Sequence, residues 1–138
     1  MSRVIKPESA ASMRNRLLRQ VATVLHEGRS DHLTEQDLQD MVAFIVLALR
    51  QIIISIDQTT TAWEKRGYWL KADRFRLDWN WVNLSSQKLE AILEENRFQE
   101  AYQVLGELAG GMQGIQPRKN VQARFWVGAW KQWENEGR

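Results

Sequence analysis

The stretch between Thr34 and Gly67 contains neither proline nor glycine, and no other feature constrains the fold of this chain as strongly. Thr34 is a favourable helix N-cap residue. Asp37, three positions later, gives a variant of the capping box, in which glutamate or glutamine is usual. Gly67 is the next residue at which a helix readily ends. We therefore predict one helix over residues 34–66, roughly 50 Å long at about 1.5 Å per residue.

The middle of this predicted helix, MVAFIVLALRQIIISI at positions 41–56, is apolar almost all round. A helix of this composition is covered by neighbours on several sides. The run has 16 residues and includes Arg50, Gln51 and Ser55, whereas a membrane span needs about 20 predominantly apolar residues. We therefore expect a central core helix and no membrane insertion.

Three further helices are predicted from apolar residues that recur every three or four positions. They cover residues 7–27, 69–95 and 97–113. Pro7 suits a first helical position, Gly28 suits the stop of that helix, and Asn96 suits a turn. Because short connections favour antiparallel neighbours, we predict an all-α, up-and-down four-helix bundle in a single domain, with a long central helical hairpin.

The remaining residues, 114–138, form a tail that carries three of the seven tryptophans. The two long predicted helices extend beyond the two shorter ones, so part of the long hairpin is left uncovered. We expect the tail to fold back over this gap. Trp126 and Trp130 would then join the tryptophans of the hairpin.

Composition excludes several classes of function. The chain has no cysteine, which rules out disulfides, thiolate metal sites and cysteine nucleophiles. The net charge of +2 is distributed in blocks of alternating sign, whereas a nucleic-acid-binding protein more often has one large basic excess. The first twenty residues have no apolar run followed by a cleavage site, so we expect a cytoplasmic protein.

The stretch WEKRGYWLKADRFRLDWNW, residues 63–81, surrounds the hairpin turn at Gly67. One interpretation is an internal seam, lined by tryptophan and arginine and covered by the tail. The other is an interface with a second copy or another protein, because Trp, Tyr and Arg dominate binding hot spots. The candidate interface or ligand-binding residues are Trp63, Arg66, Trp69, Arg74, Arg76, Trp81, Trp126 and Trp130.

Two further hypotheses use the same stretch. A pocket between the hairpin and the tail could bind an anionic or aromatic ligand through Arg66, Arg74 or Arg76. Single-stranded nucleic acid is the third hypothesis, since such binders interleave aromatic and basic side chains. It is disfavoured because Asp73 and Asp78 lie in the same patch and oppose phosphate.

No motif predicts catalysis, a cofactor or a metal. His26, Glu27, Asp31 and His32 cluster around one loop, but their spacing matches no established site and the chain has no third histidine. A Ser-His-Asp set, a phosphate-binding loop and a dinucleotide glycine fingerprint are all missing from the sequence. The sequence does not define an activity, and our first hypothesis is a non-enzymatic protein-interaction module that self-associates.

The segments WEKRGYW, KADRFR and FWVGAW resemble those of an uncharacterised group of short bacterial all-helical proteins. The likeness covers most of the chain. It implies a bacterial cytoplasmic protein and carries no assigned activity, so it implies no catalytic residue.

Overall fold

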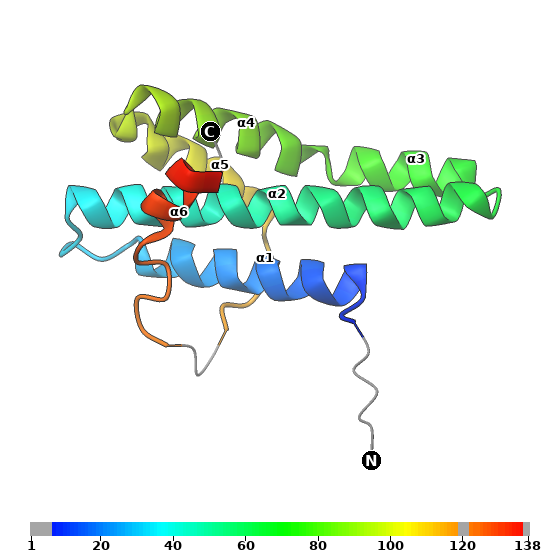
Figure 1. Cartoon of the computed structure of the whole chain (residues 1–138), viewed down its shortest axis with the longest axis horizontal. Coiled ribbons are helices and arrows are strands. Elements are labelled where there is room, and N and C mark those ends of the chain that lie inside the picture. The colour runs from blue at the N-terminus through cyan, green and yellow to red at the C-terminus, as the bar shows by residue number, and fades with distance from the viewer. Residues whose placement is uncertain (1–6, 119–121, 137–138) are drawn as a thin grey trace, which may run out of the picture.

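In the computed structural model, residues 7–118 and 122–136 are described, and within them six α-helices and one 3₁₀ turn pack together without any strand (Figure 1). The all-α class is therefore confirmed. The elements are α1 (Ala10–Glu27), α2 (Glu35–Lys65), α3 (Trp69–Asp78), α4 (Asn80–Glu95), η1 (Phe98–Glu100), α5 (Ala101–Gly111) and α6 (Ala129–Glu136).

The N-terminus of α2 is closed by the predicted capping box. The Thr34 hydroxyl accepts from the backbone N–H of Asp37 at 3.0 Å, and the Asp37 carboxylate accepts from the backbone N–H of Thr34 at 3.0 Å. Two N–H groups that the helix cannot satisfy internally are thus paired. The aspartate variant of the motif therefore works as the usual glutamate does.

Helix α2 is the axis of the molecule, and α1, α3, α4 and α6 all pack against it (Figure 1). The side chains of Val42, Val46, Leu49 and Ile52 are fully buried. By length and composition α2 could also cross a membrane, but 61% of its most apolar window is buried within the structure. This burial agrees with the core role that the sequence predicts.

The predicted first helix starts later than expected, so its first boundary was wrong. Helix α1 begins at Ala10, because Ser9 is its N-cap and accepts from the backbone N–H of Ser12 at 3.1 Å. Pro7 lies before the helix. Helix α1 ends at Glu27 and is followed by Gly28, as the sequence predicts.

The helix predicted over 69–95 is divided in two, at Trp79. Its backbone has φ −104° and ψ 6°, and the Val82 N–H bonds to the Trp79 carbonyl in a tight three-residue step. Residues two apart point in different directions on a regular helix. The break lets the rings of Trp79 and Trp81 stack with centroids 5.8 Å apart. This packing is invisible in the periodicity of the sequence.

The helix predicted over 97–113 is also shorter and divided. Asn96 adopts the left-handed conformation of a turn, with φ 56°, as the sequence predicts. The 3₁₀ turn η1 then leads into α5, which ends at Gly111. Three-residue turns of this type commonly precede α-helices.

The tail does not cover the uncovered part of the long hairpin, and this prediction was wrong. Helix α6 packs against the N-terminal half of α2, at the end opposite the hairpin turn (Figure 1). The backbone N–H of Trp130 donates to the Asp40 carboxylate at 3.0 Å, and Arg124 pairs with Asp37 at 2.6 Å. The acidic start of α2 thus binds the tail.

We expect Trp133→Ala to lower the free energy of unfolding by about 3–5 kcal/mol, the usual cost of removing a buried aromatic side chain. Trp133 is fully buried although it lies only five residues from the chain end. Urea unfolding followed by circular dichroism measures the change. Val127→Ala, at an exposed tail position, is the control. Equal stability of the two variants would mean that α6 is not docked.

A second prediction concerns pH. The hydrogen bond from the Thr34 backbone N–H, with a further contribution from Arg124, holds the pKa of Asp37 below its ordinary value. A lowered folded-state pKa stabilises the protein above the unfolded-state pKa of about 4, and this stabilisation is lost as the pH falls through the folded value. We expect Asp37→Asn to be less stable than wild type at pH 7.

The difference between Asp37→Asn and wild type should shrink as the pH falls below about 4, where the unfolded-state carboxylate becomes protonated, and it should vanish once the pH lies below the lowered folded-state pKa. Thermal unfolding measured from pH 7 to pH 2 tests this. Asp31→Asn, at an exposed loop carboxylate, is the matched control and should follow the wild type. A difference that stays constant over the whole range would contradict the prediction.

Candidate functional site

The C-terminal end of α2, the turn at 66–68 and α3 form a projecting hairpin, which we call the hairpin end (Figure 1). The turn lies where the sequence predicts it. Gly67 has φ +82°, and the backbone N–H groups of Gly67 and Tyr68 return to the carbonyls of Glu64 and Trp63 at 3.0 and 2.9 Å. A glycine adopts this left-handed conformation at little cost.

A row of four aromatic rings runs along the inner side of the hairpin end into α4. Trp63 meets Phe75 edge-on at 5.0 Å, Phe75 lies 5.9 Å from Trp79, and Trp79 stacks on Trp81. At its far end, Trp81 lies against the backbone of Gly111, where an added Cβ would come within 3.0 Å of the ring. Two predicted binding residues, Trp63 and Trp81, are therefore half-buried members of an internal row.

Arg14 is a buried cation that the sequence interpretation missed. Only 7% of its surface is exposed, and its guanidinium lies 5.0 and 5.6 Å from the ring centres of Phe75 and Trp79. It donates to the hydroxyls of Ser55 and Thr59, each at 3.3 Å. Burial lowers the pKa of Arg14 from its usual high value, because desolvation disfavours the charged form.

The position of Arg14 could have indicated its role. It lies three and four residues before Leu17 and Leu18, on the apolar stripe of the first helix, where a basic residue is unexpected. Arg14 joins α1, α2 and the aromatic row through one side chain. It marks the boundary between the packed body of the molecule and the hairpin end.

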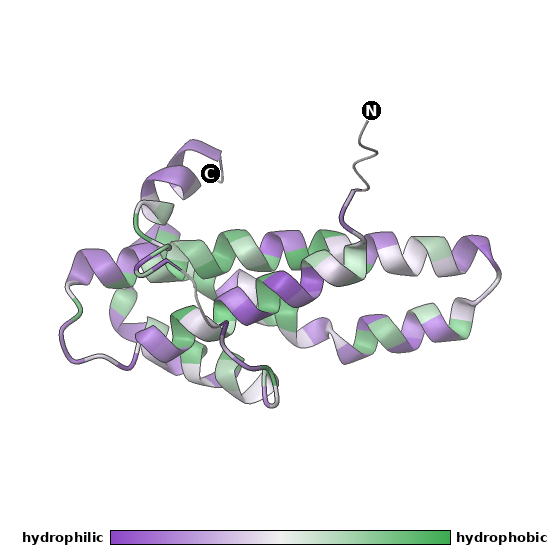
Figure 2. Ribbon diagram, turned by 90° about the horizontal axis from the view of Figure 1, so that it is seen from below, coloured by the Kyte–Doolittle hydropathy of each residue, from purple (hydrophilic) through white to green (hydrophobic). Residues whose placement is uncertain are grey.

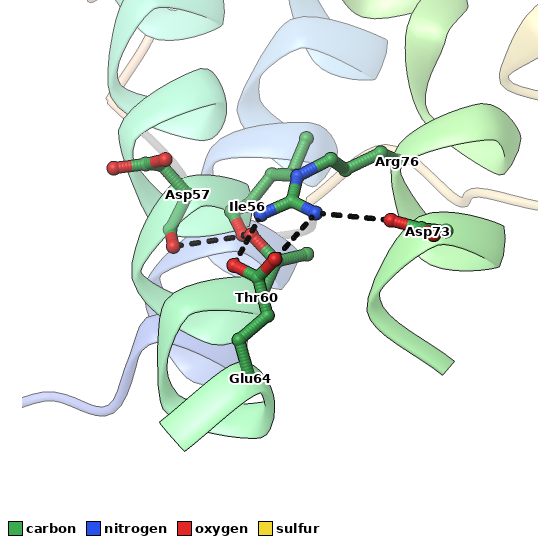
Figure 3. A network of polar contacts seen from close by, with 6 residues as sticks. All are labelled: Ile56, Asp57, Thr60, Glu64, Asp73 and Arg76. Carbon is green, nitrogen blue, oxygen red and sulfur yellow. Dashed lines mark hydrogen bonds and ion pairs between the residues drawn. The ribbon is translucent and has the colours of Figure 1, made fainter. Parts of the chain in front are cut away.

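Arg76 is held within the hairpin by charge (Figure 3). Its guanidinium bonds to the Glu64 carboxylate at 2.7 Å and reaches Asp73 at 3.5 Å. The hydrogen bond from Arg76 lowers the pKa of Glu64, and Glu64 in turn raises that of Arg76. Among the arginines predicted to bind a ligand, Arg76 is thus already engaged in joining α3 to α2.

Thr60 lies one helical turn before Glu64 in α2 and is fully buried. Its hydroxyl donates to the backbone carbonyls of Ile56 and Asp57 at 3.0 and 3.2 Å (Figure 3). A threonine in a helix interior satisfies its hydroxyl in this way. The polar contact that joins α2 and α3 is therefore the partly exposed Arg76–Glu64 pair. It leaves the outer side of α3 without a partner in the described chain.

The outer side of α3 exposes large apolar side chains among charged ones. Leu70 and Leu77 are 72% and 77% exposed, and Trp69 is 60% exposed. All ten residues of α3 are described, and Ala72 is the only buried one. In Figure 2 hydrophobic segments recur along α3 as far as the hairpin turn.

A groove with a volume of about 610 Å³ adjoins this face. It lies between the end of α2 and α3. Its lining residues are Trp63, Gly67, Tyr68, Trp69, Leu70, Lys71, Arg74, Phe75 and Asp78. Three predicted binding residues (Trp63, Trp69 and Arg74) therefore meet there, while Arg66 is exposed at the turn outside the lining. The Lys71 ammonium lies 4.3 Å from the ring centre of Trp63.

Trp126 and Trp130 are not part of this groove, so the predicted pocket between the hairpin and the tail was wrong. Trp126 is 1% exposed and its indole N–H bonds to Glu27. Trp130 lies between Phe98 and Trp133, with ring centres 5.9 and 5.4 Å away. Trp126 thus joins the tail to the end of α1, and Trp130 joins it to Phe98 and, through its backbone N–H, to Asp40 of α2.

Comparison of the chain with protein-family models, with curated protein sequences and with solved structures finds no significant match. Within residues 7–118 and 122–136, no three His, Asp or Glu side chains gather closely enough to hold a metal ion. The hairpin end, with its exposed large apolar side chains and the adjoining groove, is therefore the candidate functional site.

We expect Arg14→Ala to destabilise the protein by about 2–4 kcal/mol, because it removes buried packing as well as the bonds to Ser55 and Thr59. Arg14→Met should be tolerated much better, since it keeps a long apolar stem and removes the desolvated charge. Urea unfolding gives both values. Arg19→Ala, at an exposed position of α1, is the control and should stay within about 0.5 kcal/mol of wild type.

A methionine variant that is less stable than the alanine variant would contradict this account of Arg14. If the methionine variant lost as much stability as the alanine variant, the charge itself would be required. If neither variant differed from the Arg19→Ala control, Arg14 would not join the body to the hairpin end.

Proposed function

We propose that the protein is a non-enzymatic interaction module that self-associates through the outer face of α3. The exposure of Trp69, Leu70 and Leu77 carries this proposal. Single exposed apolar residues are ordinary on protein surfaces, but a cluster of large ones on one short helix marks an interaction site. Tyr68, 53% exposed, extends the cluster to the turn.

The spacing of the two leucines suits packing against another helix. Seven positions correspond to about two helical turns, so Leu70 and Leu77 lie on one face with Arg74 between them. Repeats of this spacing form the seam of paired helices. Helix α3 presents one such repeat to solvent.

The order of charges on α3 favours a second copy as the partner. Lys71 lies near the start of the helix, Arg74 just past its middle, and Asp78 at its end. In an antiparallel pair about a two-fold axis, Lys71 of each copy lies opposite Asp78 of the other. The same pairing brings Leu70 close to Leu77 of the other copy. A symmetric dimer therefore brings the Lys71–Asp78 pairs and the leucines together, with the Arg74 side chain of each copy near the two-fold axis.

The size of the surface sets the expected strength. Ten residues give a helix of about 15 Å, whereas stable interfaces usually bury about 1,200–2,000 Å² in total. Two α3 helices bury less than that. We therefore expect a weak dimer whose population rises with protein concentration.

Exchange of the two charges tests the antiparallel pairing. We expect Lys71→Asp alone and Asp78→Lys alone to weaken the dimer about two- to tenfold, because each places like charges opposite each other. The double variant restores opposite charges and should recover the wild-type affinity. Sedimentation velocity over a concentration series, with native mass spectrometry for stoichiometry, measures all four proteins.

Leu77→Glu should abolish the dimer, and Val127→Glu, at an exposed tail position, is the matched control. A wild-type protein that stays monomeric at the highest soluble concentration would refute self-association. A dimer that tolerates Leu77→Glu would refute this face. Failure of the double charge variant to recover affinity would refute the antiparallel arrangement.

The groove beside α3 supports a second candidate, the binding of a small anionic or aromatic ligand. Its volume of about 610 Å³ falls within the range of roughly 300–1,000 Å³ typical of ligand sites. Lys71 and Arg74 supply positive charge beside the rings of Trp63 and Trp69. Quenching of tryptophan fluorescence by an aromatic carboxylate, lost in Arg74→Gln, would favour it. Single-stranded nucleic acid stays the third candidate and ranks below the others, because the Asp78 carboxylate also lines the groove and would repel phosphate.

We further propose that the scaffold is an up-and-down four-helix bundle in which α3 and α4 together form one element of the bundle. The short turns at Gly67 and Asn96 support this topology. A bacterial and cytoplasmic origin also stays part of the proposal. It is supported by the sequence resemblance and by the absence of cysteine.

A further inference from the structure

A second groove, remote from the hairpin end, lies between α1, α2 and α5. Helix α1 packs along α2, α5 packs mainly on α4, and α1 and α5 touch each other only slightly. Three of the residues that line it are small, Gly28 after α1 and Gly106 and Ala109 on α5, while Leu25, Tyr102 and Leu105 line it with larger side chains. An added Cβ at Gly106 would meet no atom within 4 Å. The groove is open because the three small residues carry no bulk.

The floor of this groove is apolar and largely shielded from water. It is made by Val24, Leu38, Met41 and Ile45, whose exposed fractions lie between 1% and 8%. Space lined by such side chains is poorly solvated, because water finds no polar partners there. A molecule with an apolar part can fill it without displacing strongly bound water.

The volume limits the size of the occupant. The groove measures about 230 Å³, whereas an engineered apolar cavity of about 150 Å³ binds benzene. Sites for drug-sized ligands begin at roughly 300 Å³. The groove therefore fits a fragment-sized group, such as a phenyl ring or a medium-length alkyl chain.

Polar groups occur only at the mouth of the groove. Arg29 is the one charged residue among the lining residues, and the half-exposed Tyr102 brings a hydroxyl from α5. Within the part of the chain that the structure describes, the Arg29 side chain makes no hydrogen bond or ion pair. A guanidinium is well suited to bind a carboxylate through two parallel hydrogen bonds.

We propose that this groove binds a small amphipathic monocarboxylate, with its alkyl or phenyl group on the Met41 and Ile45 floor and its carboxylate at Arg29. The combination of an apolar floor and a single cation at the mouth selects this class over neutral or cationic molecules. The site is independent of self-association, because it lies between other helices and at the other end of α2.

Titration of the full chain with octanoate, followed by amide NMR, tests this assignment. We expect saturable shifts at residues of α1 and α5 around the groove and weak binding. Octylammonium, which has the same chain and the opposite charge, should bind at least tenfold more weakly. Arg29→Gln should weaken octanoate binding about tenfold, and Arg19→Gln, at an exposed position of α1, should leave it unchanged.

Gly106→Leu provides a blocking variant that should fold at least as well as wild type, because leucine favours a helix more than glycine does. Its side chain would occupy the groove, so octanoate binding should be lost. Equal binding to wild type and Gly106→Leu would overturn the proposal, as would equal binding of octanoate and octylammonium. Shifts confined to the hairpin end would assign the carboxylate to the α3 groove instead.

Discussion

The burial of α2 is the constraint on which the rest of the structure depends. A 31-residue helix whose middle, residues 41–56, is apolar almost all round cannot remain in water unless other segments cover it. Four other helices pack against it from different sides. The capping box at Thr34 fixes where it begins, and Gly67 fixes where the chain turns back. The positions of the other elements follow from the need to cover this helix.

The cover is unequal at the two ends of α2. The tail adds a further layer at its N-terminal half, where Asp37 and Asp40 bind it through Arg124 and the backbone of Trp130. At the other end only α3 and the start of α1 remain, and α3 buries a single residue. The proposed interface on the outer face of α3 follows from this difference. The proposed carboxylate groove lies at the covered end, where α1 and α5 touch each other only slightly.

Tryptophan serves two purposes in this chain, which composition alone does not separate. Trp126 and Trp133 are core residues that fasten the tail, whereas Trp69 is largely exposed beside two leucines. Trp63 and Trp81 are half-buried, since each contacts the internal aromatic row on one side. The interpretation of residues 63–81 as a seam applies to the inner side of α3, and the outer side is the exposed one to which our proposed interface belongs.

The sequence by itself determined the all-α class, the extent of α2, its capping box and the turns at Gly67 and Asn96. These features depend on local chemistry, namely breakers, caps and periodicity, which neighbouring residues fully define. Tertiary structure alone decided the break at Trp79, the burial of Arg14 and the docking of the tail. Each of these depends on contacts between residues far apart in the chain, such as Arg14 with Ser55 and Trp130 with Asp40. Local patterns leave such contacts open, because several surfaces of similar hydrophobicity compete for the same segment.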